Sequence, residues 1–198
     1  MKFAEILEAS YNEVSQVSHQ IKAICDKNFE ETQIDDNCIN FWKNRLWFTV
    51  FVYDTFLDSG LRDKLEYLTA IEIKNSEFGE SFNFLNNENN NIDWVGVKEE
   101  FGLYINVGVC IAQNLEDTTY LDDFCKNLKL KPHLGEIKKL EDDSSCIVIL
   151  EEKFKYIDYK ELEKKLLHSI SVIQDEAFIF ADIFQKEFNG YFHLKPLD

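Results

Sequence analysis

Residues 101–112 read FGLYINVGVCIA and are the clearest predicted strand in the chain. Its residues alternate between large apolar and smaller or more polar types, which is the two-residue period of a β-strand with one face against a core. The predicted core-facing residues are Phe101, Leu103, Ile105, Val107, Val109 and Ile111. Tyr104, Asn106, Gly108 and Cys110 share the other face, where the small residues favour close packing within the fold.

A long helix is predicted from residue 158 towards the end of the chain. Asp158 and Glu161 form a capping box at its start, and Ile157 is placed to pack on Leu162 as a hydrophobic staple. Apolar residues then recur at a spacing of three to four, which defines one helix face. This stripe consists of Leu162, Leu166, Ile170, Ile173, Ala177, Phe180, Phe184 and Phe188.

Three apolar residues of this helix, Phe178, Ile179 and Ile183, lie off the stripe. A helix that is apolar on more than one side is expected to be buried on more than one side. The helix is therefore expected either to lie between layers of the fold or to meet a second copy of the chain, which would make the protein a homodimer.

The remaining elements complete an α+β fold. Residues 3–28 have the apolar spacing of a helix, FEETQIDDN interrupts the pattern, and Asn-rich residues 86–91 form a solvated loop. Further predicted elements are strands at the end of 41–54, at 64–75 and at 146–150, and a short helix at 119–128. We expect a single domain, residues 1–198, with a mostly antiparallel sheet of four to five strands and the N-terminal and long C-terminal helices packed on it.

Composition and charge restrict the partners. The net charge of −16 repels nucleic acid and anionic membranes, so no direct binding to either is expected, and a cationic partner is favoured. The sequence shows neither an apolar signal segment nor a run long enough to span a bilayer. The five cysteines are widely spaced without a CxxC pair, which is typical of reduced thiols in a cytoplasmic protein. The scattered histidines and cysteines predict no metal site, and no cofactor is expected.

One short motif raises the alternative of a nuclease. Glu72 and Lys74 point to the same side of a predicted strand, and Asp54 ends the preceding strand, so the three could hold Mg²⁺ and assist attack by water. In outline this resembles the PD-(D/E)xK nuclease superfamily. There, however, the motif lies on the second and third strands, and a DNA-cutting enzyme needs a cationic track that a chain with only Arg45 and Arg62 as arginines does not provide. An ordinary strand with a charged outer face is the favoured interpretation.

The charge distribution is more informative than this motif. Residues 75–123 contain ten carboxylates and a single lysine, Lys98, giving a net charge of −9. An uneven excess of one sign costs stability through repulsion, which suggests that it is used, and Trp94 among the acids fits an interface anchor. A solvated surface that favours solubility is the other interpretation. The predicted partner-binding residues are Glu77, Glu80, Glu88, Asp93, Trp94, Glu99, Glu100, Glu116, Asp117, Asp122 and Asp123.

Two non-enzymatic functions fit these features. The first is an acidic inhibitor of the immunity-protein, antitoxin or nucleic-acid-mimic type, whose carboxylates neutralise a basic partner. The second is a secretion-type chaperone, because the chain resembles type III secretion chaperones in its acidity, α+β class and element order. Salt distinguishes the two: an inhibitor's binding should be electrostatic and salt-sensitive, and a chaperone's should depend on apolar grooves and tolerate salt.

Overall fold

The computed structural model describes residues 3–55, 102–116, 118–141 and 146–196. Its elements, in chain order, are α1 (Phe3–Asn28), β1 (Glu30–Asp35), β2 (Cys38–Lys43), β3 (Leu46–Asp54), β4 (Leu103–Gln113), the 3-10 turn η2 (Thr118–Tyr120), α5 (Leu121–Asn127), β5 (Glu136–Glu141), β6 (Cys146–Lys155) and α6 (Tyr159–Phe188). The predicted strand at 64–75 and the loop at 86–91 lie outside the described residues.

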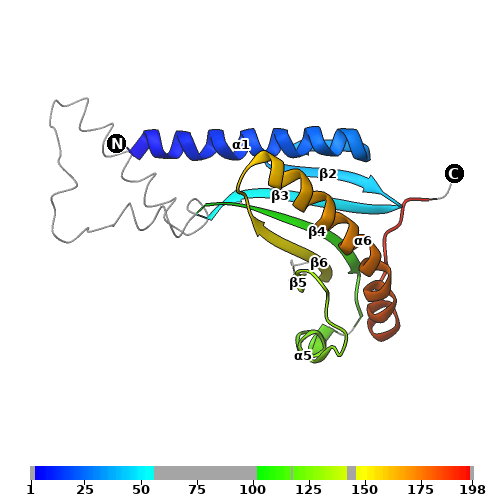
Figure 1. The fold of residues 1–198 in the computed structure, drawn as a ribbon. Coiled ribbons are helices and arrows are strands. Elements are labelled where there is room, and N and C mark those ends of the chain that lie inside the picture. The colour runs from blue at the N-terminus through cyan, green and yellow to red at the C-terminus, as the bar shows by residue number, and fades with distance from the viewer. Residues whose placement is uncertain (1–2, 56–101, 117, 142–145, 197–198) are drawn as a thin grey trace, which may run out of the picture.

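The strands form one antiparallel sheet of six, in the order β1-β2-β3-β4-β6-β5. Both long helices lie on the same side of it (Figure 1). Helix α1 packs against β1, β2 and β3, and α6 crosses β4 and β6. The α+β class with an N-terminal and a long C-terminal helix on the sheet is thus confirmed.

Strand β4 lies at the middle of the sheet and shows the predicted alternation. Its residues from Leu103 to Cys110 are alternately buried and half-buried. The alternation ends at an irregularity between Cys110 and Ala112, where Ile111 and Ala112 are both buried. Such a bulge adds one residue to a strand and lets two successive side chains face the core.

The prediction of four to five strands was too low, because the two edge strands are mostly polar. β1 has the sequence EETQID, with Ile34 as its one large apolar residue, and β5 has the sequence EIKKLE. An edge strand has fewer apolar neighbours than a central strand, and charged residues at an edge discourage pairing with other chains. Neither segment therefore has the strong apolar alternation from which β4 was predicted.

The segment 41–54 ends in a strand, β3, as predicted, and its first residues belong to β2. Asn44 and Arg45 have φ angles of 47° and 71° and form the tight turn between the two strands. Two successive positive φ values are typical of the type I′ turn, whose twist suits a hairpin. Strand β6 continues to Lys155, beyond the predicted end at residue 150, because its residues 151–155 pair with residues 104–108 of β4.

Helix α6 begins and packs largely as predicted. The carboxylate of Asp158 accepts a hydrogen bond of 2.9 Å from the Glu161 amide, which satisfies one free N–H of the first turn. The whole predicted stripe from Leu162 to Phe188 is buried. Ile157 is 64% exposed, so the predicted staple onto Leu162 does not form.

No helix or strand among the described residues covers the second face of the sheet. On this face Phe51 is 39% exposed, and Trp47, Tyr53 and Tyr104 are half-buried. The side chains therefore cover one another: Tyr53 stacks on Tyr104 at 6.1 Å between ring centres. The ammonium group of Lys153 lies 4.9 Å and 4.6 Å from the centres of these two rings, in cation–π geometry.

We predict that Phe184→Ala lowers the free energy of unfolding by roughly 3–5 kcal/mol, because it removes a fully buried ring and leaves a cavity. The matched control is Phe178→Ala on the same helix, where the ring is 43% exposed and the expected change is much smaller. Urea denaturation followed by circular dichroism measures both. Equal effects of the two substitutions would contradict the position of α6 over the sheet.

Candidate interaction surface

The described residues include three of the eleven predicted partner-binding residues: Glu116, Asp122 and Asp123. All three are exposed, and they lie close together in sequence around η2 and the start of α5. The other eight lie outside the described residues: Glu77, Glu80, Glu88, Asp93, Trp94, Glu99, Glu100 and Asp117. The predicted acidic surface is thus described only where the chain leaves β4.

Two of these three carboxylates have lysines of the same chain nearby. Asp122 accepts a hydrogen bond of 3.0 Å from Lys139 on β5, and Asp123 lies 4.0 Å from Lys126. The Asp122 side chain is 61% exposed and the Asp123 side chain 82% exposed. Exposed ion pairs contribute only ~0–1 kcal/mol, so a cationic partner can exchange with these lysines at little cost.

The nuclease alternative rests on Asp54, Glu72 and Lys74. Asp54 ends β3 opposite Leu103 and is only 8% exposed. Its side chain lies on the helix-covered side of the sheet, because it alternates in step with the buried Val50 and Val52. Glu72 and Lys74 lie outside the described residues.

Within residues 3–55, 102–116, 118–141 and 146–196, no three His, Cys, Asp or Glu side chains converge in a way that would hold a metal ion. Neither long helix in these ranges, nor the short α5, combines the length and apolar character needed to cross a bilayer.

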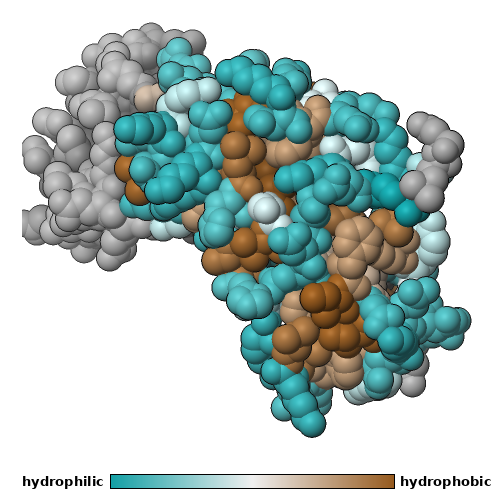
Figure 2. All heavy atoms as spheres, turned by 45° about the vertical axis from the view of Figure 1, so that its right-hand side comes forward, coloured by the Kyte–Doolittle hydropathy of each residue, from teal (hydrophilic) through white to brown (hydrophobic). Residues whose placement is uncertain are grey.

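The outward side of α6 carries exposed apolar residues. Phe178 is 43% exposed and Ile179 is 51% exposed, and Asp175 and Asp182 are exposed about one helical turn before and after them. We call these four residues the α6 outer face. Phe178 meets Phe192 of the C-terminal segment edge-on, at 5.6 Å between ring centres. Figure 2, in which this end of the molecule is turned forward, shows apolar surface bordered by hydrophilic side chains.

The expectation that α6 is buried on more than one side is met only in part. Ile183 is half-buried and packs beside the core, whereas Phe178 and Ile179 remain open to solvent among the described residues. The homodimer that would cover them stays a prediction. The three off-stripe residues thus do not behave as a single group.

Beside the outer face, a buried carboxylate fastens a loop to α6. Glu176 is 7% exposed, and its two carboxylate oxygens accept from the His133 amide at 3.1 Å and 3.2 Å. The same carboxylate also contacts Nδ1 of the His133 ring. His133 lies in the loop between α5 and β5. The anchoring partner lies 43 residues away in the chain, so local sequence gave no signal for it.

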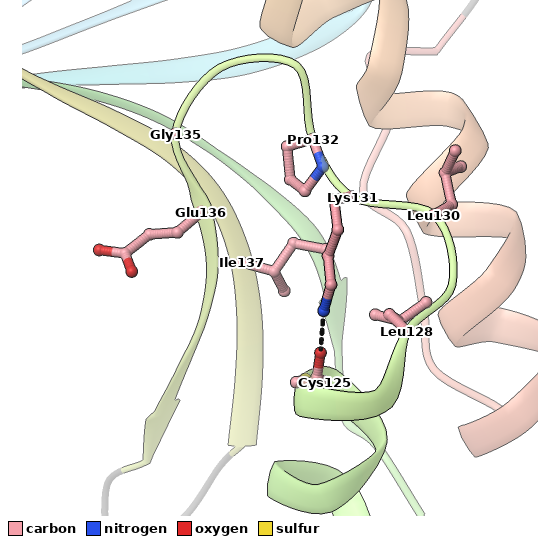
Figure 3. Close-up of a pocket in the computed structure, with 8 residues that line it drawn as sticks. All are labelled: Cys125, Leu128, Leu130, Lys131, Pro132, Gly135, Glu136 and Ile137. Atoms are coloured by element: carbon pink, nitrogen blue, oxygen red, sulfur yellow. Dashed lines mark hydrogen bonds between the residues drawn. The ribbon is translucent and has the colours of Figure 1, made fainter.

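A cleft of about 210 Å³ lies between this loop, α5 and β5 (Figure 3). The side chain of Lys131 extends across it and donates to the carbonyl oxygens of Cys125 and Lys126, at 3.4 Å and 3.0 Å. A lysine that meets the last carbonyls of a helix satisfies groups that the helix leaves free. The cleft is therefore occupied in part by a contact that ends α5, and we assign it no ligand.

A polar network lies on the uncovered face of the sheet. Glu151 is 4% exposed, forms an ion pair with Lys138 and accepts a hydrogen bond of 2.7 Å from Asn106. The hydrogen bond with Glu151 raises the pKa of Lys138, which keeps the lysine charged. Glu151 pairs with Gly108, where an added Cβ would lie 3.4 Å from the Glu151 Cβ. The small residue predicted to permit close packing thus accommodates a carboxylate within the sheet.

Comparison of the chain with protein-family models, with curated proteins and with solved structures found no match. The chain's own charge, exposure and packing are therefore the basis for inferring its function.

Burial raises the pKa of the Cys25 thiol to about 12. The thiolate is the reactive form, and an unfolded cysteine ionises near pH ~8.5. We predict that iodoacetamide at about pH 8 modifies Cys25 only after the protein is unfolded in urea. Cys38 and Cys110, whose pKa values are raised by lesser burial, should react before it. Peptide mass spectrometry follows each site, and reaction of native Cys25 at the rate of a free thiol would contradict its buried position.

Proposed function

We propose that this chain is a non-enzymatic acidic protein that binds a basic partner protein and neutralises it, as an inhibitor of the immunity-protein, antitoxin or nucleic-acid-mimic type does. The observation that carries the proposal is the net charge of −16 together with its display at the surface. Among residues 8–55, 102–116, 118–140 and 147–196, only Asp54, Glu151 and Glu176 are carboxylates buried from solvent. Carboxylates at the surface create a long-range field that attracts cations and speeds encounter with them.

A second acidic stretch supports the proposal and was not among the predicted binding residues. Asp26 at the end of α1 and Glu30, Glu31, Asp35 and Asp36 in and after β1 are all exposed. Lys22 pairs with Asp26 at 2.6 Å, and Lys195 lies 3.2 Å from Glu30 and 2.8 Å from Glu31. Residues 1–40 also contain more acidic than basic side chains. The excess in residues 75–123 is larger, and the binding residues were predicted there for that reason.

A secretion-type chaperone is the second candidate, and the α6 outer face favours it. Phe178 and Ile179 are exposed on a helix whose other side is anchored in the core. Chaperones of exported proteins need apolar surface for a partner segment, and binding that depends on such surface is little affected by salt. The partner's response to salt separates the two candidates.

We predict that the natural partner, captured from the native host and purified, is basic and associates at up to ~10⁸–10⁹ M⁻¹s⁻¹ at low salt, with a rate that falls steeply as salt is added. Neutralising Glu99, Glu100, Asp122 and Asp123 to their amides should slow association, and stopped-flow mixing across a salt series measures the change. Unfolding by urea should be followed in parallel, because less repulsion can stabilise the variant.

The matched control neutralises Glu30, Glu31, Asp35 and Asp36, which removes the same number of charges from β1 and its turn. A larger loss of rate for the first set places the partner at residues 75–123. An equal loss indicates a general field without a preferred docking region. Association unchanged by either set, with no response to salt, would contradict the inhibitor and support the chaperone.

A further inference from the structure

The α6 outer face is an exposed apolar pair on a rigid support. Phe178 and Ile179 are flanked in the chain by the buried Ala177 and Phe180, whose side chains fix the helix against the sheet. Phe178 also touches Phe192, so the apolar surface continues onto the C-terminal segment. A preordered apolar surface binds a partner with little loss of conformational entropy, and aromatic residues are frequent anchors of such contacts.

Carboxylates stand on both sides of this pair. Asp175 and Asp182 are exposed, one turn towards each end of the helix. Asp182 meets Lys186 at 2.5 Å, but the two side chains are 58% and 74% exposed, so this pair is weak and can be exchanged. Asp175 interacts electrostatically with Lys43 on β2. The α6 outer face is thus apolar at its centre with one carboxylate on either side along the helix, and it is complementary to a segment that is apolar at its centre and carries cations on either side.

A second copy of the chain does not fit this pattern. Two α6 helices related by a two-fold axis and centred on Phe178 and Ile179 would place Asp175 opposite Asp182 if antiparallel. A parallel pair would place each carboxylate opposite its own copy. Like charges then meet in both arrangements, between two molecules that each carry −16.

We infer that the α6 outer face is a docking site for a cationic amphipathic segment of another protein, whose apolar side chains cover Phe178 and Ile179 and whose flanking lysines or arginines meet Asp175 and Asp182. The inference rests on the proposed function, since it names the part of a basic partner that is recognised. It adds a site outside residues 75–123, and it combines apolar with charged contacts.

The test uses the full chain and a fluorescent peptide of about 14 residues, roughly four helical turns, built from leucine and lysine in amphipathic helical order. A peptide of the same composition in scrambled order keeps the charge but has no apolar face. Fluorescence anisotropy at about 0.15 M salt, where general attraction is screened beyond ~8 Å, gives both dissociation constants. We expect the amphipathic peptide to bind at least about tenfold more tightly, a difference of ~1.4 kcal/mol.

Three variants locate the binding. Phe178→Ser with Ile179→Ser should remove the preference for the amphipathic peptide, and Asp175→Asn with Asp182→Asn should weaken its binding severalfold. Ile157→Ser with Leu140→Ser is the matched control, because these residues are 64% and 47% exposed elsewhere in the fold, and it should leave binding unchanged. Circular dichroism establishes that each variant is folded.

Equal binding of the two peptides, no binding of either, or an unchanged preference in the Phe178/Ile179 variant would each overturn the inference. So would a native dimer, seen by sedimentation velocity, that this variant converts to a monomer, because the occupant is then a second copy. If a natural partner binds in a salt-sensitive way and binds the Phe178/Ile179 variant equally well, the α6 site is wrong. The proposed function is then still supported. If no basic partner associates with the chain, the proposed function fails first.

Discussion

The packing of α6 on β4 forms the centre of the hydrophobic core. β4 presents Ile105, Val107 and Ile111 to the helix side, and α6 brings Phe180 and Phe184 over it, all of them fully or almost fully buried. Removing such side chains from water supplies ~1.5–3 kcal/mol each, so this one contact contributes a large part of the core. It also determines which side of α6 faces solvent: the helix orientation that buries Phe180 leaves Phe178 and Ile179 exposed.

Long-range polar contacts attach the remaining pieces to this core. Glu176 on α6 fixes the loop at His133, and Arg45 in the β2–β3 turn exchanges two hydrogen bonds with Lys195, of 2.7 Å and 2.9 Å. Phe124 from α5 meets the rings of Phe184 and Phe188 edge-on, which places α5 on the helix side of the sheet. The apolar core sets the layers, and these contacts set the loops and the chain end.

The sequence predicted the parts of the fold in which one face is apolar and the period is regular. The two long helices and β4 have this property, because each buries a continuous stripe. It did not predict β1 and β5, because these segments lack an apolar residue at every second position. They are strands because each pairs with a neighbouring strand. Nor did it predict the contacts of Glu176 or Lys195, which join residues far apart in the chain. For the candidate surface, the charge pattern identified Asp122 and Asp123 as exposed carboxylates. The apolar residues of α6 that lie off its buried stripe included Phe178 and Ile179. Which of these apolar residues remain exposed depends on how α6 lies on the sheet, and this could not be read from the sequence.

The order of the strands has a consequence for how the chain acquires its fold during synthesis. α1, β1, β2 and β3 follow one another directly in the chain and contact one another, so these contacts can begin to form while the ribosome is still translating the remainder. β4 can join them, but its apolar face has no cover until β6 and then α6 have emerged. The middle of α6 follows the end of β4 by about sixty residues. During that interval the nascent chain displays the aliphatic surface of its central strand. The charged edge strands and the surplus of carboxylates, which keep like chains apart, then protect neighbouring nascent chains on the same messenger from one another.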